Sequence, residues 1–105
     1  MRIDHLVNGK PLASRAYFET VNPATQQVLA EVARGGAAEV ASAVAAARTA
    51  FPAWAGRPAG ERAARMRKLG DLIARETSAL ARTETEDTGQ PIAQTARQLI
   101  PRAAD

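Results

Sequence analysis

The pair Gly35-Gly36 divides the sequence into two parts with different hydrophobic periodicity. Before it, short β-rich runs alternate with turn signals that contain Asn, Gly and Pro. After it, apolar residues recur every three or four positions, which is the spacing of one face of a helix. The sequence therefore predicts strands over about residues 3–34 and helices over about residues 37–104.

Two turn signals organise the predicted strands. Asn8-Gly9 indicates a type I′ hairpin, because both residues tolerate the positive φ that this turn requires. Residues 22–27 join the β-rich runs Tyr17–Val21 and Val28–Val32, and Pro23 forces Asn22 into an extended conformation. We expect four short strands in one or two hairpins.

The first predicted helix carries a single apolar stripe. Its members lie four or three positions apart, and they are Val40, Val44, Ala47, Phe51 and Trp54. Pro52 is expected to kink or end this helix near Phe51, because proline lacks the N–H that a helix interior uses.

Capping residues predict the remaining helices. A second helix is expected to begin near Glu61, and Thr77 or Ser78 is expected to cap a further piece that reaches Glu86. Gly89 and Pro91 then end that piece. Residues 92–100 start another helix, which Pro101 is expected to interrupt.

The composition favours part of a larger protein. Leu, Ile, Val and Phe account for 19 of 105 residues, close to the roughly 20% below which an independent core becomes doubtful. The net charge is only +3, so the helices are better explained as packing against something absent than as disordered. No cysteine, leader-like segment or long apolar run occurs, and we expect a cytoplasmic protein without disulfides or a membrane span.

The basic residues do not predict nucleic-acid binding. Arg62, Arg65, Arg67 and Lys68 spread around a helix at 100° per residue, and no aromatic residues are interleaved with them. A hydrated or ion-paired helix surface is the better interpretation.

Two blocks, taken in order, carry a family resemblance. The first is Asn22-Pro23-Ala24-Thr25, and the second is Glu84-Thr85-Glu86-Asp87-Thr88-Gly89-Gln90-Pro91. With the alanine-rich and arginine-rich helices between them, they resemble the N-terminal segment of the NAD(P)-dependent aldehyde dehydrogenase superfamily. The string Pro91-Ile92-Ala93-Gln94-Thr95, followed by Leu99-Ile100-Pro101-Arg102-Ala103, is similar to enzymes of that superfamily that oxidise semialdehydes.

The resemblance implies an α/β fold and an enzymatic parent protein. Residues 1–105 would form the N-terminal part of its cofactor-binding domain, as β-hairpins followed by three to four helices. The parent would oxidise a semialdehyde to its carboxylic acid with NAD as cofactor, and would form a homodimer or homotetramer. The catalytic and NAD-binding residues of such enzymes lie beyond position 105. We assign no catalytic and no cofactor-binding residue to this chain, which has no Cys to act as nucleophile.

One candidate site remains, a structural cation site. Several relatives bind a cation through oxygens that match Thr20, Val21 and Asp87. The alternative is that Asp87 only stabilises the end of its helix and the nearby turn. His5 is the only histidine, and we expect a solvated strand residue there.

Other functions stay open. Within the superfamily, the parent could be another member, such as one that oxidises aminomuconate semialdehyde or betaine aldehyde. In a different class, the chain would be a non-catalytic helical module whose apolar stripe, including Val40, Phe51 and Trp54, docks on a partner. Salt-sensitive binding to nucleic acid is the third alternative.

Overall fold

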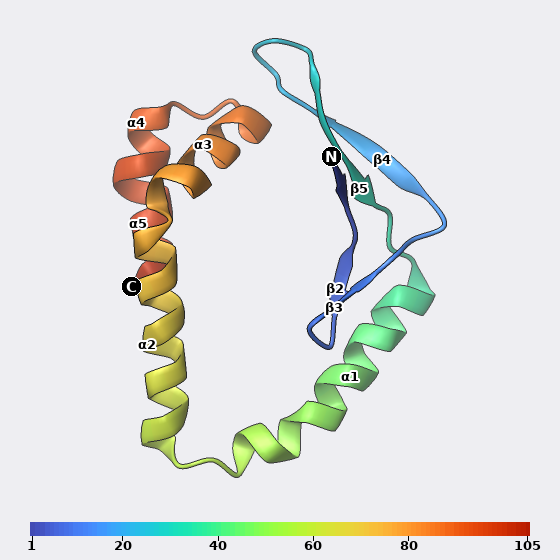
Figure 1. The fold of residues 1–105 in the computed structure, drawn as a ribbon, viewed down its shortest axis with the longest axis vertical. Helices are drawn as coiled ribbons and strands as arrows, with labels where there is room; N and C mark the ends of the chain where they lie inside the picture. The colour runs from blue at the N-terminus through green and yellow to red at the C-terminus, as the bar shows by residue number, and fades with distance from the viewer. The chain divides into compact units, whose positions relative to one another are not determined.

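A computed structural model describes all 105 residues as strands followed by helices (Figure 1). The strands are β1 (Arg2–Ile3), β2 (His5–Val7), β3 (Lys10–Leu12), β4 (Tyr17–Val21) and β5 (Val28–Ala33). The helices are α1 (Ala37–Ala55), α2 (Ala59–Arg75), α3 (Thr77–Thr88), α4 (Ile92–Gln94), the π-helical segment η1 (Thr95–Leu99) and α5 (Ile100–Ala104). This confirms the predicted α/β class, with the change from strands to helices at Gly35-Gly36.

The chain forms two compact units. The first consists of Met1–Thr20 and Val28–Arg57, and the second of Val21–Gln27 and Pro58–Asp105. The turn between β4 and β5 thus belongs with the later helices, although the strands that it joins lie mostly in the first unit.

The first unit contains two small sheets and α1. β1 pairs in parallel with β5, which lies between β1 and β4, whereas β2 and β3 form a separate antiparallel hairpin. Asn8 and Gly9 adopt positive φ angles of 52° and 72°, as expected for the hairpin turn. The sequence did not predict the parallel pairing of β1, because the two partners lie some thirty residues apart.

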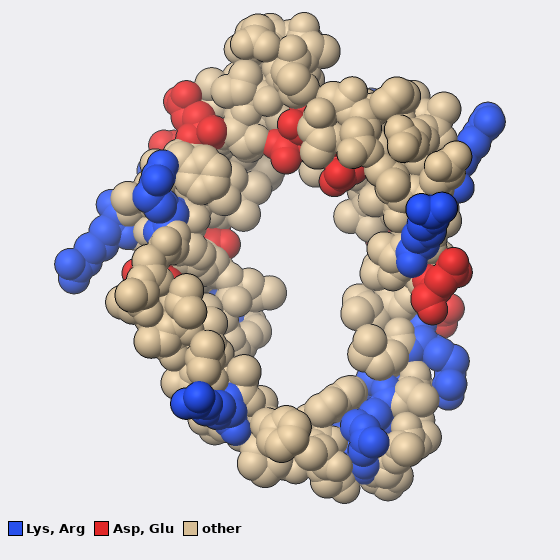
Figure 2. Space-filling model, turned by 180° about the vertical axis from the view of Figure 1, so that it is seen from behind, with Lys and Arg blue, Asp and Glu red and all other residues tan.

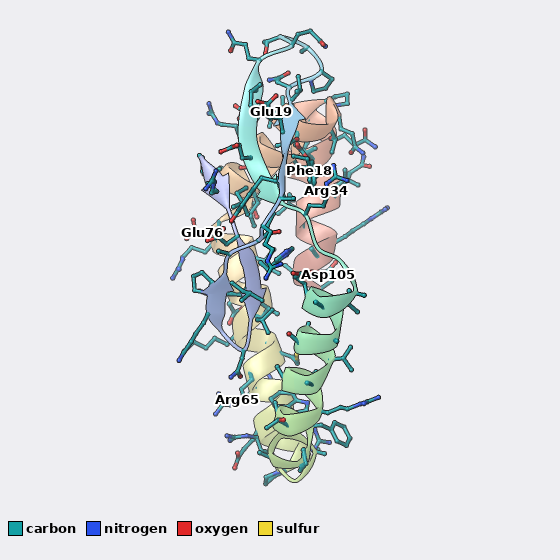
Figure 3. The ribbon with its side chains drawn as sticks, turned by 90° about the vertical axis from the view of Figure 1, so that its right-hand side faces the viewer. Phe18, Glu19, Arg34, Arg65, Glu76 and Asp105 are labelled. Atoms are coloured by element: carbon teal, nitrogen blue, oxygen red, sulfur yellow. The ribbon has the colours of Figure 1, made fainter.

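Arginine side chains stabilise the sheet of the first unit. The Arg2 guanidinium lies 4.3 Å from the centre of the Tyr17 ring and 3.2 Å from the Glu31 carboxylate. Arg34 lies 5.5 Å from the centre of the Phe18 ring, and Figure 3 shows these two side chains next to each other. In both contacts a guanidinium group lies over the face of an aromatic ring, an arrangement that the electrostatic attraction between cation and ring stabilises.

α1 is a helix with almost no buried surface. Ten of its nineteen residues are alanine, the strongest helix former, and none of the nineteen is buried. Pro52 does not end the helix at Phe51, and the expected alternative, a kink near this residue, stays a prediction. The helix continues to Ala55, where the Gly56 N–H donates to the Pro52 carbonyl at 3.0 Å. Proline removes only the hydrogen bond of its own missing N–H, and the residues after it still donate to carbonyls of the helix.

The second unit is a set of packed helices. α2 packs along α5, and α3 packs against η1 and α2 (Figure 1). Its buried residues are Ala81 of α3 and Thr95 of η1. Thr77 does not cap α3 through its side chain, contrary to expectation. Its hydroxyl donates to carbonyls of α2, to Ala74 at 2.8 Å and to Ile73 at 3.3 Å, and so satisfies the end of the preceding helix.

Pro101 also acts differently from the prediction. The helical path runs through it into α5, after a π-helical stretch in which the Ile100 N–H donates to the Thr95 carbonyl. A proline ring collides with the carbonyl four residues before it, and the wider π turn relieves that collision. None of the helices combines the length and the apolar character that crossing a membrane requires.

Candidate functional site

The candidate cation residues belong to two parts of the chain, the end of β4 and the last turn of α3. Val21 and Asp87 belong to the second unit, and Thr20 is the last residue of the preceding segment in the first unit. Asp87 lies in the last turn of α3, just before Gly89, which closes the helix with a φ of 77°. The acidic group therefore lies where the helix dipole disfavours negative charge.

The end of α3 lies directly against this turn. A Cβ atom placed on Gly89 would come within 2.9 Å of the Pro23 side chain, so only glycine allows this close approach without displacement. The positive φ of Gly89 gives a second reason for glycine at the same position. Within the second unit, the structure thus brings Asn-Pro and the Asp-Thr-Gly block together.

The turn has a fixed internal structure. The Asn22 side-chain oxygen accepts the N–H groups of Ala24 and Thr25, at 2.9 and 3.3 Å. The backbone of Asn22 also pairs with Gln26 and Gln27, at 2.8 and 2.9 Å. Asn22 therefore orders the turn through its side chain and its backbone together, which is the role that an Asx turn gives to asparagine.

A hydrogen bond between two hydroxyl groups joins α3 to η1. The Thr85 and Thr95 hydroxyls form a 2.9 Å hydrogen bond, and Thr95 also donates to the Ile92 carbonyl at 3.1 Å. Thr95 is fully buried. Next to Gly89, the Gln90 side-chain oxygen is buried without a hydrogen-bond partner, which marks an acceptor that nothing in this chain satisfies.

No cluster of metal-binding side chains supports the cation site. Nowhere do three His, Cys, Asp or Glu side chains lie close enough together to hold a metal ion. A cation at Asp87 would therefore depend on backbone carbonyl oxygens for most of its ligands, as hard cations accept.

His5 is not the solvated residue that the sequence suggested. It is half-buried, and its Nε2 atom is buried without a partner. A Cβ atom on Gly35 would lie 3.1 Å from the His5 ring, so the imidazole packs against the start of α1. The sequence missed this because the contact depends on how β2 meets Gly35, thirty residues later.

The same junction contains a carboxylate, that of Glu39, with a shifted pKa. The Gly36 N–H donates to the Glu39 carboxylate at 2.7 Å and lowers the pKa of that group from its ordinary value. The Glu39 N–H and the charges of His5 and Arg15 act in the same direction, while desolvation opposes them. This arrangement stabilises the first turn of α1, where negative charge also favours the helix dipole.

Basic side chains form no single patch on the face drawn in Figure 2. Figure 2 shows Lys and Arg scattered over the visible face, with Asp and Glu among them. A shallow groove on α2 is lined by Glu61, Ala64, Arg65 and Lys68, so its charges are mixed. Nucleic-acid binding would need a concentrated basic surface, and this arrangement does not favour it.

Comparison with known proteins gives a consistent match. The family model for the aldehyde dehydrogenase family matches residues 11–105. The chain is 54% identical over 103 residues to 5-carboxymethyl-2-hydroxymuconate semialdehyde dehydrogenase of Escherichia coli, covering 98% of this chain and 22% of that protein. It is 34% identical to 2-aminomuconic semialdehyde dehydrogenase of Bos taurus, covering 98% of this chain and 21% of the relative.

Similar solved structures include members of the same family. A putative aldehyde dehydrogenase from Burkholderia cenocepacia matches with a TM-score of 0.94 and 37% identity, over 99% of this chain and 22% of that one. PnpE in complex with nicotinamide adenine dinucleotide also matches with a TM-score of 0.94, at 33% identity over 99% of this chain and 22% of that one. The chain spans about a fifth of the length of the proteins that it matches.

Proposed function

The chain belongs to the aldehyde dehydrogenase family, and from that premise we propose that it is part of an NAD-dependent enzyme that oxidises a semialdehyde to its carboxylic acid. The observation that carries the proposal is 54% identity over 98% of this chain to an enzyme named for 5-carboxymethyl-2-hydroxymuconate semialdehyde. That compound, an intermediate of 4-hydroxyphenylacetate degradation in our interpretation, is the substrate that we assign to the parent protein.

Residues 1–105 have a structural role in this proposal. They would form the N-terminal part of the cofactor-binding domain, which later residues complete. The chain contains no Cys that could attack an aldehyde, and no glycine-rich loop that could hold a dinucleotide. The chemistry therefore belongs to the rest of the parent enzyme.

NAD is the proposed cofactor of the parent, which acts as a cytoplasmic homodimer or homotetramer. Support for NAD comes from a related structure described as a complex with nicotinamide adenine dinucleotide. Substrate choice within the family is tested by measuring the rate of NADH formation by the longer polypeptide with 5-carboxymethyl-2-hydroxymuconate semialdehyde, with aminomuconate semialdehyde and with betaine aldehyde.

The DNA that follows codon 105 gives the first test. A continuing reading frame that encodes a nucleophilic Cys supports the proposal, and the longer polypeptide should then form NADH from the semialdehyde. A stop directly after codon 105 would contradict an active parent enzyme. The 105-residue chain alone, free of longer protein, should form no NADH. Activity of that chain would show that the proposed division of roles is wrong.

We also propose a structural cation held by the Asp87 carboxylate with the carbonyl oxygens of Thr20 and Val21. The contact between Gly89 and Pro23 supports it, because the end of α3 lies against the turn that follows Val21. Carboxylate and carbonyl oxygens are suitable ligands for sodium, potassium or calcium. The competing role for Asp87 is to stabilise the helix end alone.

Thermal unfolding of the longer polypeptide distinguishes these two roles. Sodium or potassium chloride should raise the Tm above that in choline chloride at equal ionic strength, and Asp87→Asn should abolish the difference. Asp71→Asn, which removes the same charge from α2, is the control and should keep it. An equal response in choline, or a full response in Asp87→Asn, would leave Asp87 with the helix-end role only.

The exposed face of α1 supports a second candidate function, docking of a non-catalytic module on a partner. Val40 is 61% exposed and Phe51 65% exposed, although both lie on the predicted apolar stripe. A part of a larger enzyme, when isolated, should self-associate or show a broad thermal unfolding transition. A sharp, cooperative unfolding transition of a monomeric chain would favour the independent module instead.

A further inference from the structure

We draw no further inference here: the strongest candidate, the exposed apolar face of α1 formed by Val40, Val44, Phe51 and Trp54, carries none because nothing in the structure shows what covers it.

Discussion

Among the glycines of the second unit, Gly70 leaves the least room for a side chain, at the point where α2 meets α5. A Cβ atom added there would lie 2.5 Å from the Ala104 carbonyl oxygen and 3.5 Å from its carbon. A carbon atom normally approaches a carbonyl oxygen to about 3.3 Å, so α5 would have to withdraw by roughly 0.8 Å. Because the obstacle is backbone, no side-chain rotation removes it.

Two opposing free energies decide the effect of Gly70→Ala. Overpacking of a close contact costs about 1–3 kcal/mol. Alanine in place of glycine inside a helix recovers about 1 kcal/mol. Only the overpacking acts on the opening of α5, because α2 stays helical when α5 opens. We therefore expect the packing of α5 on α2 to weaken by about 1 kcal/mol or more, which corresponds to roughly a fivefold or larger change in the opening equilibrium.

Amide hydrogen exchange measured residue by residue tests this expectation. Amides of α5 should exchange about fivefold faster or more in Gly70→Ala, because opening of that helix becomes more frequent. Gly60→Ala is the matched control, since it lies in the same helix and a Cβ atom there meets nothing within 4 Å. It should leave exchange in α5 unchanged. Equal exchange in the two variants would refute the role of Gly70 as a contact residue.

Three further predictions concern the capping and buried polar groups. Gly89→Ala should lower the free energy of unfolding of the longer polypeptide, measured with urea, by more than Gly9→Ala does. Both glycines have positive φ, but only Gly89 lies against Pro23. By the same method, Thr95→Val should lower the free energy of unfolding by about 1–3 kcal/mol, because the Thr85 hydroxyl loses its hydrogen-bond partner. Thr95→Ser keeps a hydroxyl and should lower it by less. Folding lowers the pKa of Glu39 from 4.5, so the ionised Glu39 carboxylate stabilises the folded chain above that pH. This stabilisation is lost as the pH falls through the lower pKa of the folded state, and Glu39→Gln should flatten the acidic part of a curve of Tm against pH.

Local signals in the sequence predicted the elements whose geometry depends on neighbouring residues. Asn8-Gly9 formed the expected turn because the two residues themselves accept positive φ. Gly89 ended α3 in the left-handed conformation for the same reason. The change from strands to helices at Gly35-Gly36 followed from hydrophobic periodicity, which also requires only nearby residues.

The errors all involve a contact or a bond beyond the local pattern. Thr77 suits an N-cap by residue type, but the carbonyls that end α2 compete for its hydroxyl. Pro101 was expected to interrupt a helix, yet the helical path continues through it after a π-helical stretch. His5 gave no signal of burial, because Gly35 reaches it only in the folded chain.

The sequence by itself determined the family, the order of strands and helices, and the absence of a cysteine nucleophile from these residues. Those properties depend on residue identity and on spacing along the chain. Only the tertiary structure decided that β1 pairs with β5, that Pro23 lies against Gly89, and that α5 rests on Gly70. Such contacts join residues about thirty or more positions apart, and their closeness depends on backbone packing, which no local pattern of residues specifies.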